Sequence, residues 1–478
     1  MATVNGSSTV TREWVIPHPS AAERAARGKA ERAEIPRAAH ATWEARRHRP
    51  DPIALLEEQA STRVPELVPI RHGRMLVSPF TFYRGAAYVM ASDLAAAARS
   101  GLRVQLCGDA HLSNFGVFGS PERRAVFDIN DFDETLPGPW DWDVKRLAAS
   151  MELAGRDNGF SKSARADIVL LTVREYREAM RRFAKRSNLA VWYASLAVEQ
   201  IFDRFRARVG RKRIHVAEQN IAKARTRDSV QVCEKLTREV GGRRRIIRDP
   251  PLIVPMEDFV EGVAREQLEQ QVREILRGYR ATLQPDRRHL LEGYEFADMA
   301  HKVVGVGSVG ARAWIILLLG RDDRDPLFLQ AKEAQASVLE PFLGKSEYRN
   351  SGERVVAGQR LMQAASDIFL GWQRVQGEGG IERDFYVRQL RDWKFSVDIA
   401  ALDRGLLATY GRLCGWTLAR AHARSGDRIA IASYLGKADT FDEAIAAFAI
   451  AYADQAERDH QALAAAVKSG RVRAETGL

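Results

Sequence analysis

Hydrophobic residues recur with the period of an α-helix in two parts of the chain, around residue 175 and after residue 400. Three sets repeat at spacings of three and four residues: Val169, Val173, Tyr176 and Met180; Tyr410, Leu413, Thr417 and Ala421; Phe441, Ile445, Phe448 and Tyr452. Residues at those spacings share one face of a helix, and such faces usually pack into a core. The pattern therefore predicts amphipathic helices in both parts.

A different pattern occupies residues 300–395, where short apolar runs alternate with polar turns. The runs are VVGVGSVGARAWIILLLG from residue 303, LFLQAK at 327–332, IFLGWQRV at 368–375 and DFYVRQLR at 384–391. Runs of this length between turn residues are typical of β-strands. Two shorter runs, VQLC at 104–107 and AVFDI at 125–129, predict further strands earlier in the chain.

Together these patterns predict an α+β protein in four parts. Residues 1–70 are expected to form a helical or mobile arm, and residues 71–295 a largely helical lobe. Residues 296–395 are expected to form a β-rich lobe, and residues 396–478 a set of closing helices. A chain of 478 residues is long enough for several domains or for one large two-lobed domain.

Composition places the chain among globular proteins, with 45% hydrophobic and 28% charged residues. Cys107, Cys233 and Cys414 are too few and too far apart for a disulfide framework or a zinc motif. No run approaches the roughly 18 apolar residues of a membrane span, and residues 1–14 lack the apolar segment of a signal peptide. We therefore expect a cytoplasmic protein with no membrane partner.

The formal net charge of +11 raises the question of nucleic-acid binding, because arginines cluster at 204–213 and at 243–248. Acidic residues are nearly as numerous, however, at 62 against 73 basic ones. No aromatic residues alternate with the basic clusters to offer a stacking surface. The clusters are interpreted as solvated helix faces and a basic turn, or as a patch that attracts an acidic substrate, and nucleic acid is an unlikely partner.

The segment LCGDAHLSNFG at 106–116 combines residues typical of phosphoryl transfer. The strand before it ends at Gly108, which allows a sharp turn and leaves Asp109 on a loop. In phosphoryl transfer such an Asp accepts the proton of the attacking hydroxyl, and an Asn one loop further binds magnesium. Asp109 and Asn114 have this spacing, whereas His111 is interpreted as a residue that braces the loop.

A second segment, FDINDFDE at 127–134, places four acids close together. Carboxylates at that density repel one another unless a cation lies between them. A strand that delivers an Asp to its end supplies the second magnesium ligand of a phosphotransferase, and oxygen ligands suit magnesium better than zinc. Asp131 is the preferred ligand, with Asp133 and Asp128 as alternatives.

The third segment, GVGSVG at 305–310, has the G-x-G-x-x-G spacing but is followed by apolar strands instead of a helix. A glycine loop in a hairpin, followed by a strand that ends in a lysine, covers the phosphates of ATP in kinases. We therefore assign nucleotide phosphates to Gly305, Gly307, Ser308, Gly310 and Lys332. Glu353 on the next predicted helix is expected to pair with Lys332, and Glu340 is the competing partner.

The segment GDAHLSNFG resembles the GDxHxxN catalytic loop of the aminoglycoside phosphotransferase and choline kinase group. The whole run from 104 to 150 resembles an uncharacterised bacterial family, a domain of unknown function, built on the same theme. The resemblance implies a protein-kinase-like two-lobed fold, Asp131 as the metal-binding Asp, and Asp143 as an Asp that braces the loop. Arg312 departs from the kinase pattern, which has Val at that position.

In ordinary kinases the glycine loop precedes the catalytic loop, whereas here Gly305 and Lys332 follow Asp109 and Asp131. We therefore expect a circularly permuted kinase-like fold with extra helices. The predicted function is transfer of phosphate from ATP, with Mg²⁺, to a small-molecule or protein hydroxyl. Two alternatives are a catalytically silent nucleotide-binding or nucleic-acid-binding protein and a metal-dependent phosphoesterase, and nucleotidyl transfer is also open.

Overall fold

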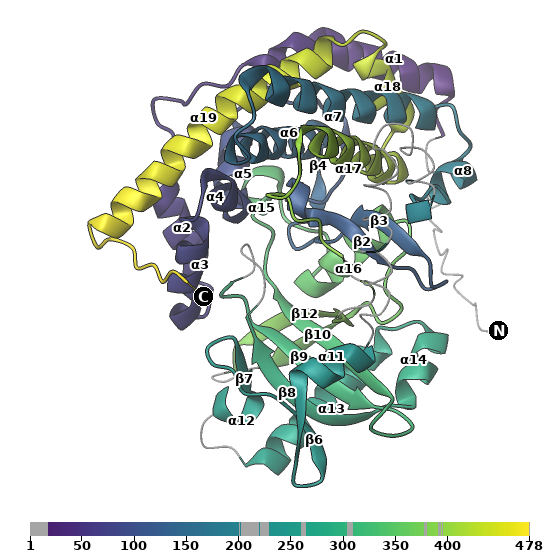
Figure 1. Ribbon diagram of the computed structural model, residues 1–478. Coiled ribbons are helices and arrows are strands. Elements are labelled where there is room, and N and C mark those ends of the chain that lie inside the picture. Colours follow the sequence, from purple (N-terminus) through teal and green to yellow (C-terminus); the bar gives the residue numbers. More distant parts are fainter. Residues whose placement is uncertain are drawn as a thin grey trace, which may run out of the picture.

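The computed structural model describes residues 18–199, 201, 219, 229–259, 264–303, 309–376, 380–390, 393 and 395–477. These residues form an α+β structure with two regions, which Figure 1 shows one above the other. We call residues 18–199 and 395–477 the helical lobe and the described residues between 229 and 390 the sheet lobe. No helix in the described ranges combines the length and the apolar character that crossing a bilayer requires.

The helical lobe contains most of the helices and two short antiparallel strand pairs. Its helices are α1 (Ala21–Glu34), α2 (Pro52–Ala60), α3 (Val68–Met75), α4 (Pro79–Gly85), α5 (Ala87–Ala95), α6 (Trp140–Asp157), α7 (Lys162–Phe183), α8 (Asn188–Trp192), α17 (Arg404–Ser425), α18 (Arg428–Leu435) and α19 (Thr440–Lys468). Short 3₁₀ turns are η1 (Arg37–Ala41), η2 (Pro65–Leu67) and η3 (Leu112–Asn114). The strand pairs are β1 (Arg103–Leu106) with β4 (Leu136–Pro139) and β2 (Phe115–Gly119) with β3 (Ala125–Ile129).

The predicted amphipathic helices are confirmed as α7, α17 and α19, whose apolar faces form the largest core. Val169, Val173 and Met180 of α7 are each at most 1% exposed. The three helices also pack closely. At Gly415 of α17, a Cβ would collide with the Thr172 carbonyl oxygen of α7. The absence of a side chain at Gly415 therefore sets the distance between α7 and α17.

The sheet lobe is built on a six-stranded antiparallel sheet in the order β11-β12-β10-β9-β8-β7. The strands are β7 (Ile253–Pro255), β8 (Glu295–Lys302), β9 (Ala313–Leu319), β10 (Pro326–Ala334), β11 (Gly371–Gln376) and β12 (Glu382–Gln389). Around it lie α11 (Ser229–Leu236), α12 (Met256–Phe259), α13 (Arg265–Ala281), α14 (Pro285–Glu292), α16 (Ser351–Met362) and the hairpin of β5 (Thr237–Val240) and β6 (Arg243–Ile246). The short helix α15 (Glu340–Leu343) packs instead against α5 and β4 of the helical lobe (Figure 1).

The strands predicted between 300 and 395 are confirmed, and the glycine segment joins β8 to β9 as the expected hairpin. The predicted boundary at residue 295 is corrected, because β7 pairs with β8 and therefore belongs to the sheet. Residues from 229 onward thus lie in the sheet lobe. The N-terminal arm is helical from Ala21 onward, and α1 packs against α18.

Replacing Gly415 with Ala is expected to destabilise the protein by about 1–3 kcal/mol, because the methyl group has no room against α7. Alanine is the better helix former, so helix propensity alone predicts the opposite sign. Gly405→Ala in the same helix is the control, since a Cβ there meets only Asp403 Oδ1 at 3.4 Å. Urea denaturation of both variants measures the difference, and equal stabilities would contradict the packing argument.

Candidate functional site

The loop after β1 places Asp109 at a half-buried position of the helical lobe. Gly108 has a φ of +83°, and a Cβ there would collide with the Glu134 carbonyl oxygen. Only glycine combines that backbone angle with so close an approach. The turn at Gly108 therefore directs Asp109 away from the strand, as the sequence predicted.

Asp143 braces this loop, which confirms the role that the resemblance implied. Its carboxylate accepts hydrogen bonds from Cys107 N (2.8 Å) and Gly108 N (3.1 Å). His422 Nε2 lies 3.2 Å from the same carboxylate. Asp143 comes from the first turn of α6 and His422 from α17, so two helices hold the loop in place.

Asp109 contacts both Arg146 and Asn114. Arg146 Nε donates to Asp109 Oδ1 at 2.6 Å, and its guanidinium lies 4.2 Å from the centre of the Tyr83 ring. Asn114 Nδ2 donates to the Asp109 backbone oxygen at 2.8 Å. Burial raises the pKa of the Asp109 carboxyl above its usual value, and Arg146 opposes that shift. The loop thus brings Asp109 and Asn114 together with a fixed cation.

His111 lies beside Asp109, with 3.6 Å between His111 Nε2 and Asp109 Oδ2. Burial, with Arg84 and Arg146 nearby, lowers the pKa of His111 well below its usual value. The imidazole is therefore neutral at physiological pH. Its backbone also takes part in the turn, because Asn114 N donates to the His111 carbonyl oxygen at 2.9 Å.

The acidic loop after β3 meets Lys332 of the sheet lobe. Lys332 Nζ hydrogen-bonds Asp133 Oδ2 and lies 4.0 Å from Asp131 Oδ2. Tyr386, opposite Lys332 on the adjacent strand β12, donates its hydroxyl to Asp133 Oδ1 at 2.8 Å. The predicted convergence of Lys332 and Asp131, which are 201 residues apart in the chain, is therefore confirmed.

The charges of this group depend on one another. Burial would lower the pKa of Lys332, but Asp131 and Asp133 raise it above its usual value. Burial would raise the pKa of Asp133, yet Lys332 and Tyr386 hold it below its usual value. For Asp131, burial and the charge of Asp133 raise the pKa. Lys332 therefore stays protonated and stabilises the two carboxylates unequally.

The partner predicted for Lys332 is corrected. The ion pairs described for Lys332 are with Asp133 and Asp131, so these residues hold it instead of Glu353 or Glu340. Glu353 lies in the first turn of α16, where its backbone N–H donates to the capping Asn350, and Glu340 Oε1 accepts from Ser337 N. A carboxylate from the acidic loop occupies the position that the kinase pattern assigns to the helix.

The next residue of α16, Arg354, holds the acidic loop instead. Its guanidinium donates to the backbone oxygens of Thr135 (2.7 Å), Asp133 (2.8 Å) and Gln335 (2.8 Å). Arg354 is 2% exposed, so these hydrogen bonds form in the interior. Helix α16 therefore fixes the backbone that carries Asp133.

Asp128, one of the alternative metal ligands, has a different environment. Its Oδ1 accepts from Arg420 at 2.5 Å, and its Oδ2 accepts from Ala364 N at 2.8 Å. Both oxygens are engaged by protein donors, and the side chain is 1% exposed. The structure therefore places Asp128 in a buried structural ion pair. The side chains of Asp131 and Asp133 are 31% and 26% exposed, so these two residues remain the candidate ligands.

Three of the predicted catalytic and metal residues, Asp109, Asp131 and Asp133, share one small cavity of the helical lobe, whereas Asn114, Asp128 and Lys332 do not line it. The cavity has a volume of about 30 Å³ and is lined by Gln59, Arg71, Arg84, Gly85, Ala87, Asp109, Asp131, Asp133 and Glu134. We call it the acid cavity. Burial raises the pKa of Glu134 to about 7, although Val338 N donates to it at 2.8 Å.

Most of the glycine segment, including Gly305, Gly307 and Ser308, lies outside the described residues. Gly310 is described, and its φ of +86° lies in the region that glycine favours. Its carbonyl oxygen accepts from Val64 N at 2.8 Å. The end of the glycine segment therefore rests on the chain that leads into α3.

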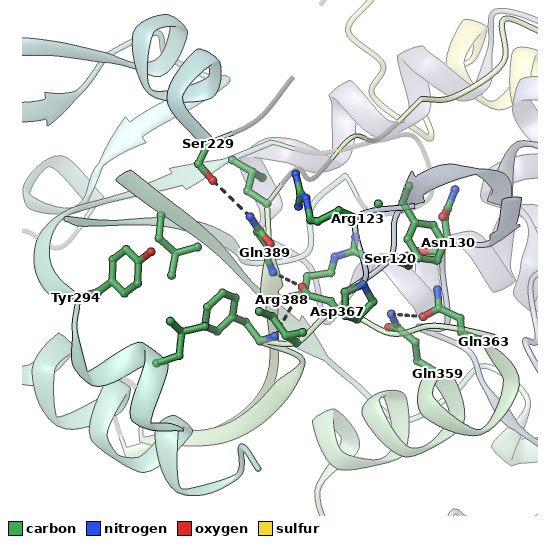
Figure 2. Close-up of a pocket in the computed structure, with 18 of the residues that line it drawn as sticks. Ser120, Arg123, Asn130, Ser229, Tyr294, Gln359, Gln363, Asp367, Arg388 and Gln389 are labelled. Atoms are coloured by element: carbon green, nitrogen blue, oxygen red, sulfur yellow. Dashed lines mark hydrogen bonds between the residues drawn. The ribbon is translucent and has the colours of Figure 1, made fainter. Parts of the chain in front are cut away.

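A second cavity, of about 300 Å³, is lined by residues of both lobes (Figure 2). The turn between β2 and β3, the end of α16 and the ends of β10 and β12 line it. Many of its polar groups bond to one another. Gln359 donates to Gln363 at 3.0 Å, and Arg388 donates to the Asn130 oxygen at 3.1 Å. The predicted catalytic residues do not line this cavity, so the site is assigned to the acid cavity.

The basic turn at 243–245 forms strand β6, and its arginines have intramolecular partners. Arg245 lies 3.6 Å from Asp298, and Arg244 donates to Thr237 Oγ1 at 3.2 Å. The other basic cluster, at 204–213, lies outside the described residues. The described turn therefore contributes to the sheet lobe and not to the acid cavity.

Sequence reasoning did not identify Arg146, which pairs with Asp109, or the two arginines that line the acid cavity, Arg71 and Arg84. Arg146 follows Asp143 by three residues, which places it on the same face of α6, so helical spacing was the available signal. Arg71 and Arg84 come from α3 and α4, which are remote in sequence from the catalytic loop. No local pattern marked those two residues.

The comparisons with known proteins identify the family of the chain. The family described as "Uncharacterized protein conserved in bacteria (DUF2252)" matches residues 63–466. The chain belongs to this family. The DUF2252 range contains Asp109, Asp131 and Lys332, and also Arg71 and Arg84. A search of curated proteins and a search of solved structures each found no match.

Replacing Asp143 with Ala is expected to destabilise the protein by about 2–5 kcal/mol, because two buried backbone N–H groups lose their acceptor. Asp167→Ala is the control, since its ion pair with Arg404 is exposed and should contribute under about 1 kcal/mol. Urea denaturation followed by circular dichroism compares the two variants. A loss at position 143 no larger than that at 167 would rule out the bracing role.

Proposed function

We propose that this DUF2252 protein transfers the terminal phosphoryl group of ATP, with Mg²⁺, to a hydroxyl acceptor. The observation that carries the proposal is the ion pair between Lys332 and the acidic loop. The ion pair connects Lys332 on β10, a strand that follows the glycine segment in sequence, to the loop that holds Asp131. Asp131 and Asp109 line the same cavity. Phosphoryl transfer requires this combination of a cation for the phosphates, metal ligands and a base.

Asp109 is the proposed base. The acceptor oxygen forms a bond to the γ-phosphorus while the bond to the β-γ bridging oxygen breaks, and ADP leaves. The acceptor proton passes to the Asp109 carboxylate, whose position Arg146 and the Asp143 brace determine. The pKa of Asp109 is raised by burial, which makes it a better proton acceptor than an exposed Asp.

Oxygen donors of the kind that magnesium prefers are present at the site. Asp131 and Asp133 line the acid cavity, and Asn114 adjoins Asp109. In the described ranges, no three or more His, Cys, Asp or Glu side chains group around a point that could hold an ion. Magnesium is commonly held by one or two carboxylates together with substrate phosphates, so a pair of carboxylates fits it. The ion supplies charge neutralisation on the phosphates.

Contacts between the end of α17 and the start of β1 support the permuted kinase-like fold. Gln105 N donates to Ser425 Oγ at 3.2 Å, and Gly426 approaches Val104 closely. A chain that ran from α17 directly into β1 would place the sheet lobe before the catalytic loop. That is the kinase order, so the two arrangements differ in connectivity and not in packing.

Isothermal calorimetry of ATP with and without Mg²⁺ tests the proposal. In the unaltered protein, Mg²⁺ should increase ATP affinity. Asp131→Asn should reduce that increase by about tenfold or more, because losing even outer-shell partners costs metal sites about 10- to 100-fold.

Asp128→Asn is the matched control, because asparagine keeps an oxygen for Arg420 while removing one carboxylate from the same loop. It should leave the effect of Mg²⁺ unchanged. An equal loss in both variants would show that Asp131 is not the metal ligand. ATP binding that does not depend on Mg²⁺ in the unaltered chain would overturn the proposal.

A further inference from the structure

We propose that Arg71 and Arg84 form an anion-binding subsite in the acid cavity and that the acceptor is a hydroxyl compound with a carboxylate or phosphate group. This inference rests on the proposed phosphotransferase function. It adds a substrate class and assigns two residues, from α3 and α4, that the catalytic loop does not contain.

Of the two arginines, Arg71 gives the stronger evidence for a bound anion. One of its terminal nitrogens, Nη2, donates to Gln59 Oε1 at 2.8 Å and to the Gly85 carbonyl oxygen at 2.7 Å. Its Nε and Nη1 have no hydrogen-bond partner among the described residues, although the side chain is 1% exposed. The Nε of Arg84 is likewise buried without a partner in that part of the chain. Both side chains line the acid cavity.

Burying the N–H groups of a guanidinium without hydrogen-bond partners costs free energy, because the groups lose their hydration and nothing replaces it. The nearby carboxylates already have other donors. Asp109 pairs with Arg146, Asp133 pairs with Lys332 and Tyr386, and Glu134 accepts from a backbone N–H. The missing partner of Arg71 is therefore best supplied by a ligand with its own negative charge.

The count of charges around the acid cavity leads to the same conclusion. Five basic side chains line the cavity or bond to its acidic residues: Arg71, Arg84, Arg146, Lys332 and Arg354. Four carboxylates line it: Asp109, Asp131, Asp133 and Glu134. The basic groups thus exceed the acids by one, and a bound magnesium ion would increase the excess. Such a site attracts anions.

The position of the arginines assigns the anion to the acceptor and not to ATP. Lys332, the proposed contact of the ATP phosphates, comes from β10 of the sheet lobe. Arg71 and Arg84 come from the helical lobe and share the cavity with Asp109. An acceptor hydroxyl must lie within hydrogen-bond reach of Asp109, so an acidic group on the same molecule falls beside these arginines.

The size of the cavity limits what enters it. A volume of about 30 Å³ corresponds to about two water molecules. A carboxylate or a single phosphoryl group is of this size, whereas a sugar ring is not. The acidic group would therefore enter while the body of the acceptor remains outside. A polycationic acceptor such as an aminoglycoside would instead bring like charges against the arginines.

Calorimetric titration of the full chain with inorganic phosphate, without nucleotide, tests the subsite. Arg71→Gln and Arg84→Gln should each weaken phosphate binding by about 10- to 100-fold, because each removes charge-assisted hydrogen bonds. Arg47→Gln, which changes an exposed arginine outside the cavity, should retain binding. Phosphate should also raise the melting temperature of the unaltered chain but not of the Arg71 and Arg84 variants.

Retention of phosphate binding in both arginine variants would overturn the subsite, as would no binding by the unaltered chain. Titration with Mg²⁺ and ATP separates this result from the proposed function. Arg71→Gln and Arg84→Gln should keep their affinity for that nucleotide. If the unaltered chain binds phosphate through the arginines but not ATP, the proposed function fails and the anion site stands.

A panel of acceptors with Mg²⁺ and ATP then tests the substrate class by release of ADP. Sugar phosphates and hydroxy acids should increase the release, and Arg84→Gln should raise their KM by about 10- to 100-fold. Neutral sugars, aminoglycosides and amino alcohols should have no effect. Turnover of a cationic or neutral acceptor that is unchanged by Arg84→Gln would contradict the assignment.

Discussion

The site depends on one buried ion pair, between Lys332 of the sheet lobe and Asp133 of the helical lobe. Lys332 is 3% exposed, so its charge needs a partner, and the neighbouring Asp131 and Asp133 need a cation between them. Strand pairing positions this contact, because Lys332 lies opposite Tyr386, which also donates to Asp133. A shift of β12 by one residue against β10 would turn Tyr386 to the other face of the sheet, away from Lys332 and Asp133.

The local features of the site could be predicted from the sequence. A strand that ends in glycine predicted the turn at Gly108, and the apolar stripes predicted α7, α17 and α19. The convergence of Lys332 with Asp131 followed from a chemical requirement, since a phosphotransferase needs both at the same phosphates. The brace from Asp143 followed from resemblance alone. These predictions succeeded because each feature depends on a short segment of sequence or on two residues that must contact the same phosphates.

The partners of each charge could not be predicted in the same way. Glu353 was assigned to Lys332, but the structure gives that role to Asp133, and Asp128 instead pairs with Arg420 of α17. The spacing of acids along a loop does not reveal which of them faces a cation from a distant helix. Arg71 lies about forty residues before Asp109, in a helix whose sequence carries no recognised motif. Only the packing of that helix brings Arg71 to the cavity.

Transfer of a radioactive phosphorus label from ATP to an acceptor in cell extract tests the central claim most directly. With label at the γ-position, the account predicts that the unaltered protein with Mg²⁺ passes label to an organic acceptor and that Asp109→Asn does not. Label that moves from the α-position would indicate nucleotidyl transfer. Binding of ATP with no transfer above the level of Asp109→Asn would indicate a nucleotide-binding protein without turnover, and either result would contradict the account.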